Sequence, residues 1–135
     1  MLQSETKIRV RYGETDQMGY VYYGNYPLYY EVARTDMIRK IGWSYKTMEK
    51  NGIMMPVVSL NVKYISPAYY DNELTIKVYV RKFPGVRMEF EYEVFNEQGK
   101  LINTGDTTLV FVDMKTGKPT GPPKAFIKLI EKYYE

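Results

Sequence analysis

The architecture of this chain follows from one stretch near its start, Tyr12-Gly-Glu-Thr-Asp-Gln-Met-Gly-Tyr-Val-Tyr-Tyr-Gly-Asn-Tyr26. A strand-like run from Thr6 to Arg11 leads into it, and Asn25-Tyr26-Pro27 opens a long amphipathic segment. Asn is a favourable N-cap, and Pro is favoured in the first helical turn, where its missing N–H costs nothing. The sequence therefore predicts a strand, a glycine-containing loop and then a long helix that begins at Tyr26.

The loop places a carboxylate, Asp16, between Gly13 and Gly19. A carboxylate that faces the start of a helix also faces free N–H groups and a partial positive charge, which can polarise a carbonyl oxygen. A nucleophile or base on one side and an electrophilic donor on the other are the requirements of acyl transfer. Asp is also common in loops because it bonds to nearby backbone N–H groups, so capping of its own turn is the alternative role for Asp16.

The remainder of the chain predicts one α+β domain. The helix from Tyr26 reaches about Ile41, and Gly42 is a suitable C-cap. Its apolar residues fall on one stripe, formed by Tyr26, Tyr30, Ala33, Met37 and Ile41. Alternating and helical patterns predict a short helix over 45–51, strands over 58–64, 74–80 and 86–94, a long strand that reaches Val112, and a helix over 124–134. A long helix before a run of antiparallel strands is typical of a sheet that wraps a helix. With 135 residues, we expect a single domain over 1–135.

Composition excludes several kinds of chemistry. The chain has no His and no Cys, which excludes the Ser-His-Asp triad, cysteine nucleophiles and the usual zinc sites, and we expect no metal. The net charge is only +3 and the basic residues are scattered, so we expect no nucleic-acid partner. No apolar run has membrane-spanning length and no signal peptide is evident. We therefore expect no membrane partner and a cytoplasmic location.

The opening stretch resembles the signature of the 4-hydroxybenzoyl-CoA thioesterase family, roughly aromatic-x-x-x-Asp-x-x-Gly-x-Val-x-Tyr-x-x-Tyr. The matching positions are Tyr12, Asp16, Gly19, Val21, Tyr23 and Tyr26. The likeness continues through 30–37, 64–71 and 113–123, so it covers nearly the whole chain. It implies the hotdog fold, in which an antiparallel sheet wraps around one long central helix.

The resemblance also implies an activity, that of an acyl-CoA thioesterase, a hydrolase that converts an acyl-CoA to the free acid and coenzyme A. In the family pattern, the thioester carbonyl oxygen points toward the backbone N–H at Tyr23, and Asp16 either attacks the carbonyl or activates a water. Both routes stay open. Coenzyme A is part of the substrate here, so no separate cofactor is expected. Many bacterial acyl-CoA thioesterases of the family carry His where this chain has Tyr23, whereas the aromatic-acyl branch carries Tyr.

The aromatic-acyl branch also holds the nucleotide phosphates of coenzyme A with basic residues near a hairpin tip. In this chain the tip, Pro84-Gly85-Val86, is flanked by Arg81, Lys82 and Arg87. The resemblance implies that these three residues bind coenzyme A. A solvated strand edge explains them equally well.

Two other carboxylates compete with Asp16. Glu14 lies off the motif position, and we expect a solvated loop charge. Glu31 lies three residues before Arg34, where a helix-surface or interface ion pair is the default, although some other hotdog thioesterases carry their carboxylate on the helix.

Two functional alternatives stay open, an acyl-ACP thioesterase and a non-catalytic acyl-CoA-binding module. Because a single hotdog sheet leaves an unpaired edge strand, which pairing removes, we expect a homodimer or homotetramer.

Overall fold

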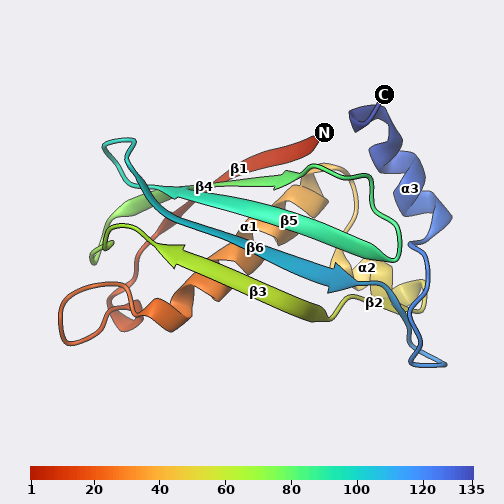
Figure 1. The fold of residues 1–135 in the computed structure, drawn as a ribbon, viewed down its shortest axis with the longest axis horizontal. Helices are drawn as coiled ribbons and strands as arrows, with labels where there is room; N and C mark the ends of the chain where they lie inside the picture. The colour runs from red at the N-terminus through yellow and green to blue at the C-terminus, as the bar shows by residue number, and fades with distance from the viewer.

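The long helix α1 (Tyr26–Lys40) crosses one face of a five-stranded antiparallel sheet in the computed structural model, which describes residues 1–135 (Figure 1). The strand order is β1-β4-β5-β6-β3. The strands are β1 (Leu2–Arg9), β3 (Val57–Tyr64), β4 (Glu73–Val80), β5 (Arg87–Phe95) and β6 (Leu101–Val110). This is the α+β arrangement of a sheet around a helix that the sequence predicts.

Shorter elements complete the chain at the two ends of the sheet. Helix α2 (Tyr45–Lys50) begins after Ser44, whose hydroxyl accepts a hydrogen bond from the Thr47 N–H at 3.0 Å. The remaining elements are β2 (Ile53–Met54), which pairs with β7 (Val112–Asp113), the C-terminal helix α3 (Lys124–Ile130), and the 3₁₀ turns η1 (Tyr12–Glu14), η2 (Tyr23–Asn25) and η3 (Glu131–Tyr133). The sequence predicted every α-helix and the longer strands to within a few residues.

The core lies between α1 and the inner face of the sheet. Strands β4 and β5 bury alternate residues, as period-2 strands with one solvated face do. From α1, the predicted stripe of Tyr26, Tyr30, Ala33 and Met37 is buried against them. The hydrophobic stripe read from the sequence therefore identifies the correct face of the helix.

Arg34 differs from the expectation of a surface ion pair with Glu31. Its side chain is only 7% exposed, and its Nη1 lies 3.4 Å from the Tyr92 hydroxyl, to which it donates. No ion pair joins it to Glu31. Arg34 is four residues after Tyr30 and so lies on the buried stripe, where its long aliphatic stem packs.

The first half of α1 is held close to the sheet by Tyr30. Its ring stacks on Tyr92 with 4.2 Å between centroids, and its hydroxyl bonds to the side chain of Asn103. A Cβ at Gly105 would collide with the Tyr30 hydroxyl and would lie 2.7 Å from the Asn61 carbonyl oxygen. Gly105 therefore permits the close approach that sets the position of the start of the helix.

Strand β3 is an edge strand with apolar side chains exposed. Val57, Val58, Leu60 and Tyr64 are each at least 44% exposed, and only one side of the strand is paired, with β6. The alternating pattern correctly predicted a strand, but its apolar residues are not core residues of one protomer. Exposed apolar edges are normally covered by another chain.

Candidate active site

The segment 12–25 forms a closed loop at one end of the sheet, beside the end of β3 (Figure 1). Thr15 and Val21 form a bridge across the loop, and the Val21 N–H donates to the Ala68 carbonyl at 2.8 Å. A second bridge joins Tyr20 to Tyr69. These contacts attach the loop to the segment between β3 and β4.

The position of Asp16 is compatible with both roles considered for it, the cap of its own turn and the nucleophile or base. Its Oδ1 accepts hydrogen bonds from the backbone N–H groups of Met18 at 2.9 Å and Tyr20 at 3.2 Å, so one oxygen caps the turn. Its Oδ2 accepts no hydrogen bond from the protein. Gly19, at φ +82°, supplies the left-handed residue that this turn requires. The turn therefore fixes the carboxylate through one oxygen and leaves the other free.

The peptide before Tyr23 presents its N–H away from the helix. The Tyr22 carbonyl accepts the Asn25 N–H at 2.9 Å inside the 3₁₀ turn, and the chain has no cis peptide bond. In a trans peptide the N–H points opposite to the carbonyl, so the Tyr23 N–H points out of the turn. It donates none of the backbone hydrogen bonds recorded for loops, turns and caps. An unused N–H just before a helix carries partial positive charge.

Asp16 and Tyr23 line the same cavity, of about 320 Å³. Its walls are mostly apolar and aromatic, and include Val21, Tyr26 and Tyr64. Burial raises the pKa of Tyr26 to about 12, and burial followed by the nearby Tyr23 raises that of Tyr64. Both phenols therefore stay protonated at neutral pH. A residue with a free carboxylate oxygen and a residue with an unused N–H thus line one small, largely apolar cavity.

Glu14 is not the solvated charge that the sequence suggested. Its carboxylate accepts hydrogen bonds from the Arg11 N–H and Nε, each at 2.9 Å, and from the Tyr29 hydroxyl at 3.0 Å. Burial opposes ionisation of Glu14, but the hydrogen bonds from Arg11 and Tyr29 outweigh it and lower its pKa below the ordinary value. The side chain lies outside the Asp16 cavity. Glu14 therefore stabilises the loop through these hydrogen bonds and does not compete with Asp16 for a catalytic role. The position of Glu14 relative to the motif did not predict these contacts.

Asn25 also differs from its predicted role as an N-cap. Its side chain makes no hydrogen bond to the helix, and its Nδ2 instead donates to the Glu14 carbonyl at 2.8 Å. The Tyr22 N–H donates to the same carbonyl at 2.9 Å. Pro27 does lie in the first turn, as expected. Asn25 thus ties the loop to the start of the helix.

The structure does not bring Arg81, Lys82 and Arg87 to the Asp16 cavity within one protomer. They flank the β4–β5 connection, at the opposite end of the sheet from the loop 12–25 (Figure 1). Arg81 pairs with Glu91, Lys82 lies 4.0 Å from Glu89, and Arg87 makes no ion pair. Strand β4 alone spans about 25 Å.

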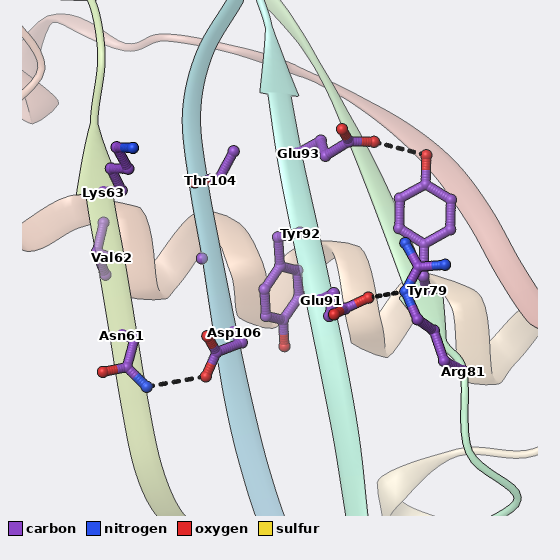
Figure 2. A pocket seen from close by; sticks show the side chains of 11 residues that line it. Asn61, Val62, Lys63, Tyr79, Arg81, Glu91, Tyr92, Glu93, Thr104 and Asp106 are labelled. Carbon is purple, nitrogen blue, oxygen red and sulfur yellow. Dashed lines mark hydrogen bonds and ion pairs between the residues drawn. The ribbon is translucent and has the colours of Figure 1, made fainter.

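A second cavity, of about 310 Å³, lies over the strands on the side away from α1 (Figure 2). Its polar groups pair among themselves. Asn61 donates to Asp106 at 2.9 Å, the Tyr79 hydroxyl donates to Glu93 at 2.7 Å, and Arg81 pairs with Glu91. The carboxylates of Asp106, Glu91 and Glu93 are thus each paired with a neighbouring side chain, whereas Asp16 keeps one oxygen free.

No group of three or more Asp and Glu side chains is placed to hold a metal ion. None of the helices combines the length and the apolar character that a membrane crossing needs.

Comparisons with known proteins identify the family and the fold of the chain. The family model of the thioesterase-like superfamily matches residues 10–130. A putative acyl-CoA thioesterase of Bacillus subtilis, YneP, is 37% identical over 123 residues, which cover 91% of this chain and 89% of that protein. A DHNA-CoA thioesterase from Staphylococcus aureus is 42% identical, with a TM-score of 0.85 over 99% of this chain and 85% of that chain. A 4-hydroxybenzoyl-CoA thioesterase variant complexed with 4-hydroxybenzoyl-CoA is 24% identical, with a TM-score of 0.84 over 96% and 99% of the two chains, and shares the hotdog fold.

Proposed function

Since the chain belongs to the thioesterase-like superfamily and its relatives include acyl-CoA thioesterases, it is an acyl-CoA thioesterase, and we propose that Asp16 and the Tyr23 N–H are its catalytic groups. The single observation that carries the assignment of these groups is their position in one chamber. Asp16, whose Oδ2 is free, and Tyr23, whose N–H is unused, line the same cavity.

In the proposed reaction, the thioester carbonyl oxygen accepts the Tyr23 N–H, which stabilises the negative charge that develops on that oxygen. The side chain of Asp16 then either removes a proton from a water that attacks the carbonyl carbon, or attacks that carbon itself to form a mixed anhydride that water later hydrolyses. In both routes the carbon–sulfur bond breaks, coenzyme A leaves as the thiolate and takes up a proton, and the acid is released. A thiolate leaves readily, so one carboxylate and one oxyanion donor can suffice in a chain without His.

The proposal includes a homodimer in which the β3 strands of two copies pair antiparallel. The exposed apolar side chains of β3 and its unpaired edge support this arrangement. A two-fold axis between the strands reverses the direction of the second copy. It therefore brings the β4–β5 tip of that copy, with its counterparts of Arg81, Lys82 and Arg87, to the same end of the joined sheet as the Asp16 loop. In this arrangement the three basic residues are available to the phosphates of coenzyme A. Two such dimers could associate further as a tetramer.

The location of the enzyme follows from its substrate. Because acyl-CoA is made and consumed inside the cell, we place the protein in the cytoplasm.

Release of free thiol from a panel of aliphatic and aromatic acyl-CoAs, followed with a colorimetric thiol reagent, tests the function. We expect turnover of at least one acyl-CoA, with equal amounts of thiol and free acid. A protein that binds acyl-CoA tightly but releases no thiol would instead be a binding module. Turnover of acyl-ACP alone would mean that the substrate's acyl group is carried by ACP and not by coenzyme A.

A further inference from the structure

Tyr64, the last residue of β3, is joined to the Tyr23 peptide group. Its hydroxyl donates a hydrogen bond to the Tyr23 carbonyl at 2.9 Å, across 41 residues of chain. Tyr64 also lines the Asp16 cavity, so the contact lies beside the proposed reaction centre.

The Tyr23 carbonyl lacks its α-helical donor because of the sequence that follows it. In an α-helix a carbonyl accepts the N–H four residues later, and for Tyr23 that residue is Pro27. Proline has no N–H to donate. The donor within the chain's own helical turn is therefore the Tyr26 N–H of the 3₁₀ turn η2, and the Tyr64 hydroxyl adds a second donor from another element.

Ring contacts reinforce the hydrogen bond. The Tyr64 ring meets the Tyr23 ring edge to face at 6.4 Å between centroids, and meets the Tyr26 ring in the same way at 5.6 Å. Edge-to-face pairs add attraction beyond their buried area. Tyr26, only 3% exposed, fixes this group of rings to the start of α1.

These contacts restrain both peptide planes that meet at Tyr23. The plane before it carries the Tyr22 carbonyl, held by the Asn25 N–H at 2.9 Å, and the plane after it carries the Tyr23 carbonyl, held by Tyr64. Two soft dihedral angles join the two planes, so restraining both planes fixes the direction of the Tyr23 N–H. Without Tyr64 the second plane keeps only the short-range contact of the 3₁₀ turn η2.

We propose that Tyr64 is a positioning residue, whose hydroxyl holds the Tyr23 carbonyl and thereby aims the Tyr23 N–H at the thioester oxygen. The inference rests on the proposed function and adds a residue to it. Tyr64 acts through the backbone, because its proton is already donated to the Tyr23 carbonyl. Its effect should therefore appear in the transition state more than in substrate binding.

The kinetic test is Tyr64→Phe, which removes the hydroxyl and keeps the ring. Loss of a hydrogen bond worth about 1 kcal/mol corresponds to roughly a fivefold to tenfold fall in kcat, and we expect KM to change less than about twofold. The matched control is Tyr70→Phe. Tyr70 is 56% exposed against 50% for Tyr64 and lies outside the cavity. Its variant should keep the wild-type kcat.

A spectroscopic test separates an effect of Tyr64 on the direction of the Tyr23 N–H from an effect on the stability of the fold. A ketone analogue of the best acyl-CoA, with a methylene in place of the thioester sulfur and a ¹³C-labelled carbonyl, is bound to each protein. The infrared stretch of that carbonyl falls in frequency as the N–H polarises it. We expect the lowest frequency in the wild type and in Tyr70→Phe, and a higher one in Tyr64→Phe. A structural role alone would lower the melting temperature and leave the frequency of the bound ketone unchanged.

A wild-type kcat in Tyr64→Phe overturns the inference, and so does a lower kcat with an unchanged carbonyl frequency. Neither result touches the proposed function, which fails only if the wild type releases no thiol or Asp16→Asn keeps full activity. Asp16→Asn should lose turnover while the ketone carbonyl keeps its low frequency, since the N–H is still in place. The two proposals therefore fail separately.

Discussion

The side-chain amide of Asn25 donates a hydrogen bond to the backbone carbonyl of Glu14 at 2.8 Å. This bond joins the residue just before α1 to the loop that carries Asp16. The same carbonyl accepts the Tyr22 N–H at 2.9 Å. The distance between the proposed nucleophile or base and the proposed oxyanion donor is thus set by contacts of Glu14, a residue that lies outside the cavity.

Asn25→Asp should slow the enzyme, because it replaces the donor by a carboxylate that repels the Glu14 carbonyl. We expect a loss of about 1–2 kcal/mol in the free energy of unfolding and a fall in kcat, measured by urea denaturation and by thiol release. Asn51→Asp is the matched control, since Asn51 Nδ2 donates to the Thr47 carbonyl at the same 2.8 Å, in α2. It should lose stability and keep its kcat. Equal kcat values in the two variants would mean that the Asn25 hydrogen bond does not affect the site.

Asp16→Asn should fold and be nearly inactive. The amide oxygen of Asn can still accept the Met18 and Tyr20 N–H groups that bind Oδ1, whereas the charge is lost. Loss of a general base commonly costs at least about 10²-fold in turnover. The control is Asp113→Asn, because Asp113 Oδ1 accepts the Lys115 N–H at 2.8 Å in another turn. Near-native turnover by the Asp16 variant would move the chemistry to another residue.

The lowered pKa of Glu14 predicts that the folded protein loses stability in acid. Its pKa is lowered in the folded protein from an ordinary 4.5. As the pH falls, the unfolded chain therefore takes up the proton first, and the stabilisation, fully present above the unfolded pKa, disappears as the pH passes through the folded pKa. The deficit of Glu14→Gln relative to wild type, from urea denaturation, should be largest near pH 7 and shrink below about pH 4.5. Glu49→Gln, at an exposed position without a hydrogen bond or ion pair, is the control. A deficit independent of pH would contradict the assignment.

The sequence predicted the parts of this protein that depend on local patterns. The stripe on α1, the alternation of β4 and β5, and the loop before Pro27 are all periodic or signalled by turn residues. The motif also placed Asp16 and Tyr23, which the structure brings to one cavity. The role of Tyr23 came from the resemblance to the 4-hydroxybenzoyl-CoA thioesterase family, whereas spacing related Asp16 only to the start of the helix.

The errors concern partners that are distant along the chain. Arg34 was placed on the surface because its partner, Tyr92, lies on β5 and gives no local signal. Asn25 was read as an N-cap, which is its commonest role at a helix start, but its amide bonds to Glu14. Tyr64 passed unnoticed because its contact with Tyr23 spans the folded sheet. One local signal exists, since Pro27 cannot donate the α-helical N–H to the Tyr23 carbonyl.

Leu60→Glu should weaken the proposed dimer. Leu60 is 44% exposed on β3 in one protomer, and its register partner is Thr107 of β6, so the opposite edge of the strand is free. A carboxylate on a buried edge would be desolvated without a partner. Sedimentation velocity at micromolar concentration should show a dimer for wild type and a shift toward monomer for the variant. Met114→Glu, with Met114 49% exposed in the turn after β7, is the control. A monomeric wild type would contradict the proposed dimer. A Leu60 variant as fully associated as the control would mean that the contact between the copies lies elsewhere. If dimer and activity are lost together, turnover by Leu60→Glu should recover as the protein concentration is raised.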